Sequence, residues 1–533
     1  MRKIIAAISF VLILTVSLSC NSPRENTSQE KISSCDETLM DTIPILEKVS
    51  SFPDTMYPSA QILMFRIDTF CYDIPAELSD LNDYYSDAPG IFTFRGSLSR
   101  NPSFSGRLHG DSLHISVDWT FATNTDTTHT IHGVWGGGTG WTGQPLYIHW
   151  PDSIMERFSS SDDTLTQNIT PQEIIVASLC GYVYFIDFHS GKPTRPFLDT
   201  QNVLKGTPSI NPSLNGSLYI GHGVPKQGVF GHSVYDLYSH QLTQSFGRDR
   251  SAWRRWNAFD SSPLVTGGFL FRPGENGTLY KYHIQGNSIQ LHSTLRYSTT
   301  KYKGSPGIES SMAICRNYGY FNDNAGNILC VNLNTLKPVW RYHNHDDSDA
   351  SPIVEMDDGI PYVYSGCEVD RQGSTGLSYF VKLNGLTGER IWEDTIRGGR
   401  IHLHDKILDG GMLSSPLLGK GDCSQMIFNN FCINDITSKG CLAAIDKRDG
   451  TILYTTPTRQ YSWSSPVAFY NDNDEMFIFT GDAAGYVYLI KGKTGEIVAS
   501  KKIGINFESS PIIVEDKIIL GSRGNKIFKI SLY

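Results

Sequence analysis

Short apolar runs separated by turn residues recur along most of this chain, and residues 463–500 show the pattern most clearly. A Ser-Ser-Pro triplet ending at Pro466 opens one run, a second run ends at Gly481, a third begins at Gly485, and a Thr-Gly turn leads into a fourth. Runs of this length between turn residues predict four β-strands rather than helices. Four such strands bury little apolar surface alone, so we expect neighbouring copies.

The chain supplies those copies at intervals of about 40 to 60 residues, the size of a propeller blade. Each copy opens with a triplet related to Ser-Ser-Pro, and the first is degenerate. The triplets end at Pro145, Pro208, Pro263, Met312, Pro352, Pro416, Pro466 and Pro511.

The last copy ends before a fourth strand, whereas an unattached fourth-strand pattern, HISVDWTF, stands at residues 114–121. A closed ring explains both facts, because the early strand would complete the final blade and remove two exposed sheet edges. The sequence therefore predicts an all-β, eight-bladed propeller over residues 91–533, closed by a strand at about 113–122. A seven-bladed ring is the alternative if the copy at Pro145 is not a blade.

Composition agrees with one globular domain built by radial repetition, since 39% of the residues are hydrophobic and 19% are charged. The net charge of −9 gives no basic surface suited to nucleic acid. We expect a monomeric propeller that binds no nucleic acid.

The first twenty residues predict export. Arg2 and Lys3 precede an apolar run too short to span a membrane, and Cys20 follows small residues, as in a lipoprotein signal. We expect lipidation at Cys20 and a location in the cell envelope, on the periplasmic side of a membrane or at the cell surface, although a plain signal peptide stays open. Residues 21–90 predict a tether followed by a segment without an assigned fold. Cys35 with Cys71, or Cys432 with Cys441, could form a disulfide, or these thiols stay free.

The repeated Ser-Ser-Pro, Gly-x-x-Tyr/Leu and Thr-Gly-x-x-x-Trp elements resemble the pyrroloquinoline-quinone (PQQ)-like propeller repeat, over about residues 113–533. Residues 92–106, which contain Phe-Arg-Gly, also resemble the leader of uncharacterised bacterial members. The resemblance implies either a quinoprotein alcohol dehydrogenase that uses PQQ and calcium, or an envelope lipoprotein such as the scaffold of the outer-membrane barrel-assembly machinery. Those dehydrogenases carry adjacent cysteines against the cofactor, and this sequence has no Cys-Cys pair.

Alignment of the opening triplets predicts a ring of side chains at the mouth of the central channel. The expected ligand-binding members, carboxylates with one lysine and a tryptophan, suit a hard cation or a polyhydroxy ligand. The alternative is that the channel holds only water and that these acids cap the starts of strands. The ring positions are Thr142, Lys205, Asp260, Glu309, Asp349, Leu413, Trp463 and Glu508.

Three loop motifs are further candidates. Trp253, Arg254, Arg255 and Trp256 suit an anionic ligand or a partner protein, or they fill space between blades. Two His-x-His motifs, which otherwise read as solvated loops, predict a transition-metal site. The glycines of residues 135–145 are expected to let the backbone approach the channel closely, with Trp135 or Trp141 over its opening. The metal candidates are His343, His345, His402 and His404.

The strong repeat and the weak catalytic signals favour a ligand-binding or protein-interaction scaffold in the cell envelope, anchored to the membrane by lipid. Its expected partner is an envelope protein or a small polar or anionic ligand. The alternative is a quinoprotein oxidoreductase that oxidises alcohols or sugars with PQQ and calcium.

Overall fold

The computed structural model describes residues 51–71, 78, 83, 85–110, 113–159, 165, 168–299, 306–403, 406–433 and 439–533. Cys20, the predicted signal segment and the first part of the predicted tether lie outside these residues. No helix in the described ranges is long and apolar enough to cross a membrane.

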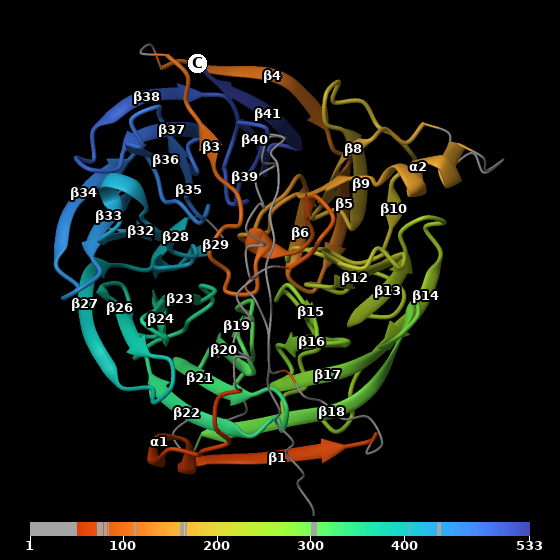
Figure 1. Ribbon diagram of the computed structural model, residues 1–533, viewed down its shortest axis with the longest axis vertical. Coiled ribbons are helices and arrows are strands. Elements are labelled where there is room, and N and C mark those ends of the chain that lie inside the picture. Colours follow the sequence, from red (N-terminus) through yellow and green to blue (C-terminus); the bar gives the residue numbers. More distant parts are fainter. Residues whose placement is uncertain are drawn as a thin grey trace, which may run out of the picture. The chain divides into compact units, whose positions relative to one another are not determined.

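Eight antiparallel sheets surround a central axis (Figure 1), so the predicted eight-bladed propeller is confirmed and the copy at Pro145 is a full blade. Each blade is numbered here in chain order, and its strands run outwards from the axis. Blade one consists of β7 (Leu146–His149), β8 (Gln172–Ala177), β9 (Tyr182–Asp187) and β10 (Leu198–Asp199), and blade two of β11 (Ser209–Ile210), β12 (Ser217–Gly221), β13 (His232–Asp236) and β14 (Leu242–Phe246). Blade three consists of β15 (Leu264–Thr266), β16 (Phe269–Gly274), β17 (Thr278–Gln285) and β18 (Ser288–Thr299). Blade four consists of β19 (Ala313–Cys315), β20 (Tyr318–Asn322), β21 (Asn327–Asn332) and β22 (Pro338–His343).

Blades five to eight continue the ring. Blade five consists of β23 (Ile353–Asp357), β24 (Ile360–Gly366), β26 (Gly376–Asn384) and β27 (Arg390–Gly398), and blade six of β31 (Leu417–Leu418), β32 (Met426–Cys432), β33 (Gly440–Asp446) and β34 (Ile452–Thr458). Blade seven consists of β35 (Val467–Tyr470), β36 (Met476–Gly481), β37 (Tyr486–Lys491) and β38 (Ile497–Lys502). Blade eight consists of β39 (Ile512–Val514), β40 (Lys517–Ser522), β41 (Lys526–Leu532) and β4 (Ile115–Ala122).

The other elements decorate this ring. Three short strands pair with blades: β1 (Leu63–Thr69) on the outside of blade three, β2 (Gly90–Ile91) on blade one, and β3 (Gly106–Arg107), which is parallel to β35. Further pairs are β5 (Thr125–Thr130) with β6 (Gly133–Gly137), β25 (Glu368–Val369) with β30 (Gly410–Gly411), and β28 (Ile401–Leu403) with β29 (Lys406–Leu408). The helical elements are α1 (Pro58–Gln61), η1 (Phe94–Gly96), α2 (Asp152–Ser159) and η2 (Gly421–Cys423), where η marks a 3-10 turn.

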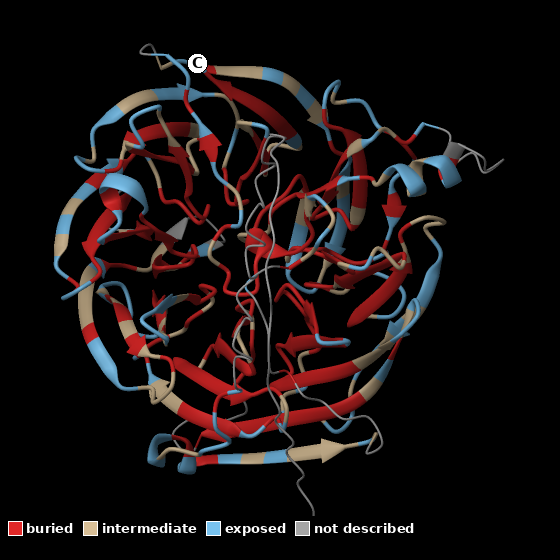
Figure 2. Cartoon of the chain, viewed as in Figure 1, coloured by how far each residue is buried: buried red, intermediate tan, exposed pale blue. Residues whose placement is uncertain are grey.

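The ring closes as the sequence predicts. The early strand β4 pairs antiparallel with β41, and Phe121 lies opposite Ile527. Blade eight therefore takes its outermost strand from the amino-terminal side of the propeller, and the edge of β41 is covered. Figure 2 shows buried residues gathered on the inner strands, whereas outer strands such as β38 are largely exposed or half-buried.

The second serine of the repeated triplet links neighbouring blades. Its backbone N–H donates to the hydroxyl oxygen of the matching serine in the next blade, which explains why a small hydroxyl side chain recurs at this crowded position. The observed pairs are Ser262 with Ser311, Ser311 with Ser351, Ser415 with Ser465, and Ser465 with Ser510.

Fourth-strand tryptophans dock on the Thr-Gly or equivalent turn of the next blade. The indole N–H of Trp340 donates to Gly385 O at 2.8 Å, and that of Trp119 in β4 donates to Phe188 O at 3.0 Å. A Cβ atom on Gly388 or Gly191 would come within 2.6 Å of these rings, and both glycines have a positive φ. Trp119 therefore fastens blade eight to blade one and completes the circle.

The segment for which the sequence assigned no fold contributes to the propeller. β1 pairs along its length with β18, and Phe52 packs into the hydrophobic core beside Tyr318 and Trp340. Among the described residues the cysteines are free thiols, and Cys441 lies opposite Phe431 rather than bonded to Cys432. The disulfide between Cys432 and Cys441 considered from the sequence is therefore absent.

Candidate functional site

Residues 90–107, which we call the plug, reach the inner strands of the propeller and contact its central core. Backbone N–H groups of Ile210 and Ile314 donate to carbonyl oxygens of the plug, and β2 and β3 pair with blades one and seven. The guanidinium of Arg95 donates to the carbonyls of Pro416 and Pro466, so the plug also joins blades six and seven. Phe94 of the plug lines a central cavity.

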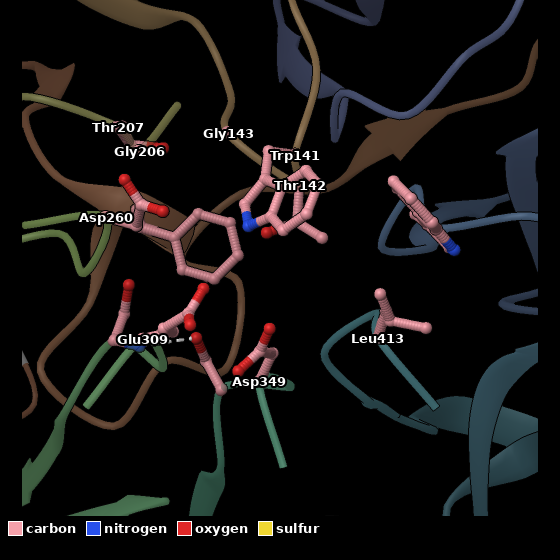
Figure 3. A pocket seen from close by; sticks show the side chains of 13 residues that line it. Trp141, Thr142, Gly143, Gly206, Thr207, Asp260, Glu309, Asp349 and Leu413 are labelled. Atoms are coloured by element: carbon pink, nitrogen blue, oxygen red, sulfur yellow. Dashed lines mark hydrogen bonds between the residues drawn. The ribbon is translucent and has the colours of Figure 1, made fainter. Parts of the chain in front are cut away.

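Six of the eight ring positions line this cavity, as the alignment of the triplets predicts. Figure 3 shows Asp260, Glu309 and Asp349 on one side of it and Leu413 on the other. The cavity volume is about 20 Å³, which is room for one or two water molecules or a single ion. Besides these residues, Thr142, Trp463, Trp141 and Phe94 contribute to its lining.

The remaining two ring positions hold ion pairs beside the cavity. Lys205 is buried, forms an ion pair with Asp260, and lies 3.9 Å from a carboxylate oxygen of Glu309. Glu508 lies 3.6 Å from the guanidinium of Arg523. Burial alone would lower the pKa of Lys205, but the surrounding carboxylates raise it, so the ammonium stays charged.

Two groups of carboxylates contribute to the cavity lining, one through Asp260 and Glu309 and the other through Asp349. In each group, one oxygen from every member lies within 4.8 Å of the others, a spacing at which a metal ion can be shared. Glu309 belongs to the first group and also acts electrostatically on the second. The groups are Asp260, Glu275 and Glu309, from blades three and four, and Asp347, Asp349 and Glu368, from blade five and the connection before it.

The alignment of triplets did not reveal Glu275 and Glu368, because these residues follow the second strands β16 and β24 rather than precede the first strands. Aligning the ends of the second strands would have placed Glu275 and Glu368 beside the ring. Asp347 lies two residues before the ring position Asp349 and was also missed.

Burial raises the pKa of four of these carboxyl groups, and neighbouring carboxylates raise it further. Without a cation, these carboxyl groups therefore release their protons at a higher pH than ordinary carboxyl groups do. The four groups are Glu275, Asp347, Asp349 and Glu368.

Aromatic side chains cover the cavity on the side of Lys205. The ammonium nitrogen lies 4.1 Å from the ring centroid of Trp141, and the ring of Trp463 lies 5.5 Å from that of Trp141 in an edge-to-face arrangement. Trp135 stands next in this row, 6.0 Å from Trp141. Trp141 and Thr142 have φ values of 55° and 61°, a backbone conformation that costs free energy for a β-branched residue.

The tryptophan-arginine loop lies at a separate groove. Arg255 and Trp256 line that groove, and Trp253 is 40% exposed. Arg254 instead turns inwards and lies against Gly307. The structure therefore does not place the two arginines in one site.

The first His-x-His motif is packed against blade five. His345 stacks on Tyr379 with ring centroids 3.6 Å apart, and its Nε2 lies 3.1 Å from Glu393. The ring centroids of His343 and His345 lie 6.0 Å apart. His404 and the side chain of His402 lie outside the described part of the chain, so the metal site with four histidines stays a prediction.

Comparisons with known proteins agree with this fold. No family model matches the chain, and no curated protein matches it. Among solved structures, the quinohemoprotein alcohol dehydrogenase of Comamonas testosteroni is similar, with 10% identity, a TM-score of 0.56, and coverage of 83% of this chain and 80% of that one. The quinohemoprotein alcohol dehydrogenase ADHIIG of Pseudomonas putida HK5 has 12% identity, a TM-score of 0.52, and coverage of 86% and 83%.

BamB of Moraxella catarrhalis is also similar, with 13% identity, a TM-score of 0.44, and coverage of 67% of this chain and 93% of that one. At these identities the likeness concerns the fold. The chain therefore shares its fold with these two quinohemoprotein alcohol dehydrogenases, and its function has to be argued from its own residues.

Proposed function

We propose that this chain is a binding propeller of the cell envelope whose central cavity holds one hard divalent cation, such as Ca²⁺, while its loops bind a partner. The observation that carries this proposal is a set of six carboxylates, three of which line a cavity of about 20 Å³. The cations that face this set are Lys205, paired with Asp260, and Arg371, 3.5 Å from Asp347. Oxygen donors of this density are the ligands that Ca²⁺ prefers.

Electrostatics favours occupation of the cavity by a cation. Two ionised carboxylates 4.8 Å apart repel by about 3 kcal/mol at an effective dielectric constant of 20. A divalent ion between them replaces that repulsion with attraction. Lys205 offsets only part of the negative charge, because it is already paired with Asp260.

PQQ does not fit this cavity. The quinone carries three carboxylates and is much larger than the one or two water molecules for which the cavity has room. The acidic lining would also repel its carboxylates. The carboxylate oxygens can bind Ca²⁺, but the cavity has no room for the quinone. A role in cation binding is therefore favoured over alcohol oxidation. With PQQ and Ca²⁺ added, we expect no alcohol-dependent reduction of an electron-accepting dye.

Calorimetric titration of the metal-free protein with Ca²⁺ tests the proposal. We expect about one ion per chain and an increase in thermal stability. Glu309→Gln should weaken Ca²⁺ binding at least about tenfold, because Glu309 is close to both carboxylate groups. Asp472→Asn is the matched control, since Asp472 is an exposed acid outside the cavity. No heat and no stabilisation at millimolar Ca²⁺ would remove the proposal.

The envelope location is supported by the lipoprotein-like signal that ends at Cys20. In cells labelled with a palmitate analogue, we expect the label on the wild-type protein and its loss in Cys20→Ser. Label that persists in Cys20→Ser would place the lipid elsewhere or argue against this anchor.

A further inference from the structure

A groove lies beside the connection from blade two to blade three, separate from the central cavity. Its volume is about 480 Å³, compared with about 20 Å³ for the cavity, so it accepts a much larger ligand. The lining combines two arginines with aromatic and apolar side chains. The lining residues are Val229, Phe230, Gly247, Arg248, Arg255, Trp256 and Asn257.

Trp256 is held in place before any ligand binds. Its ring centroid lies 5.4 Å from that of Phe230 and 5.2 Å from that of His132, the latter in an edge-to-face arrangement. His132 stands in the turn of the hairpin β5–β6, so two distant parts of the chain fix the indole. A half-buried aromatic ring fixed in this way loses little conformational freedom when a partner packs on it.

The two arginines of the groove carry uncompensated charge. Arg248 and Arg255 are exposed, and within the described ranges neither guanidinium forms an ion pair or a side-chain hydrogen bond. The carboxylate of Asp249, between them in sequence, instead accepts a hydrogen bond from Tyr280 at 2.8 Å and lies 3.3 Å from Arg296. The groove is therefore positive on a chain whose net charge is −9.

Apolar side chains border the same groove. Val229, which is 50% exposed, lines it together with the ring of Phe230. A carboxylated sugar would pair with the arginines but would leave these apolar side chains in water. A peptide with acidic and apolar residues covers both, which favours a polypeptide ligand.

We propose that this groove binds an acidic segment of a partner protein. Aspartate or glutamate side chains of the segment pair with Arg248 and Arg255, and an apolar or aromatic side chain between them packs on Trp256 and Phe230. The proposal does not depend on a cation in the central cavity. Arg254 faces Gly307, so we expect it to make no contact with the ligand.

Selection of phage-displayed dodecapeptides on the full chain tests this proposal. We expect enriched peptides with at least two acidic residues flanking Trp, Phe, Leu or Ile. Counter-selection on the double variant Arg248→Glu with Arg255→Glu should remove these peptides. Enrichment of peptides without acidic residues, or equal enrichment on the double variant, would overturn the proposal.

Fluorescence anisotropy of one labelled selected peptide then separates the contribution of the two arginines to its affinity from that of Trp256. We expect Arg248→Glu with Arg255→Glu to weaken binding at least about a hundredfold, and Trp256→Ala about thirtyfold, as for an interface hot spot. Trp256→Phe should recover most of the affinity because it keeps the aromatic packing. Arg250→Glu is the matched control, since Arg250 is exposed in the same loop but does not line the groove.

Two other anions serve as competing outcomes. Polygalacturonate and vesicles of phosphatidylglycerol with phosphatidylcholine should bind weakly and show no dependence on Trp256. Binding of either that requires both arginines and Trp256, without binding of the selected peptide, would assign the groove to a sugar or a lipid surface and contradict the proposal. Unchanged melting temperatures of the variants establish that each is folded.

Discussion

Two buried arginines hold the plug in the centre of the propeller. Arg95 and Arg100 are 1% and 0% exposed, and burial lowers the pKa of each to about 9. Their guanidinium groups donate to main-chain carbonyls instead of to carboxylates: Arg95 to Pro416 and Pro466, Arg100 to Ser262 and Met312. A planar group with five N–H donors can reach several blades at once, which a lysine ammonium cannot do in this geometry.

Arg95→Met should therefore destabilise the propeller. The substitution keeps a long side chain but leaves buried carbonyl oxygens of blades six and seven without donors, at a cost on the order of 3 kcal/mol. Urea unfolding followed by tryptophan fluorescence measures the change. Arg107→Met is the control, because Arg107 is 52% exposed and its guanidinium contacts surface groups, the carboxylate of Asp474 and the carbonyl oxygen of Asn471. Equal stability of both variants would show that the plug is not fastened by Arg95.

At the scale of single elements, β4 performs two tasks. It pairs with β41 inside blade eight, and its Trp119 docks on the turn of blade one that contains Gly191. Replacing residues 113–122 by ten glycine and serine residues should abolish both contacts without shortening the chain. We expect a lower unfolding temperature and soluble aggregates, because the edge of β41 becomes exposed.

Calorimetry and size-exclusion chromatography measure these effects. The same glycine-serine replacement over Thr125–Thr130 is the control, since β5 forms no strand pairing with a blade in the described residues and lies in a largely exposed hairpin. This replacement removes only side-chain contacts to the blades, such as the ion pair of Asp126 with Lys226. A wild-type melting curve after loss of residues 113–122 would contradict the role assigned to β4.

The elements of this fold were predictable because they repeat. The triplets that end at Pro263, Pro416 and Pro466 recur at blade-sized intervals, and in each of these three the second serine donates to the matching serine of the next blade. The ring of side chains at the cavity followed from the same alignment. What occurs once could not be predicted this way: the plug has no second copy, and Glu275 and Glu368 follow second strands of different blades.

The direction in which side chains of irregular loops point could also not be predicted from the sequence. Arg254 and Arg255 are adjacent and identical in chemistry, yet Arg254 faces Gly307 and Arg255 faces the groove. Their positions depend on the path of a loop without periodicity, which local pattern does not determine.

At the scale of the whole molecule, the carboxylates link the stability of the ring to pH. A carboxyl group whose pKa is raised in the folded protein stabilises the fold below its unfolded pKa, and that stabilisation is lost as pH rises through the folded value. The stabilisation that these carboxyl groups give the metal-free propeller should therefore decline as pH rises above about 4.

Bound Ca²⁺ should reverse this trend, because it stabilises the ionised carboxylates of blades three to five. We expect the increase in unfolding temperature on adding Ca²⁺ to be larger at pH 8 than at pH 5. Scanning calorimetry at both values, with Glu309→Gln alongside, measures the effect. An increase that is independent of pH would place the ion away from these groups.

The pairing of β4 with β41 also dictates an order of events during synthesis. The two strands are separated by about 400 residues, which a ribosome adds in roughly 20 to 80 s. Until β41 (Lys526–Leu532) has been made, β4 lacks the strand with which it pairs. Blade eight therefore cannot form before nearly all of the propeller has been synthesised.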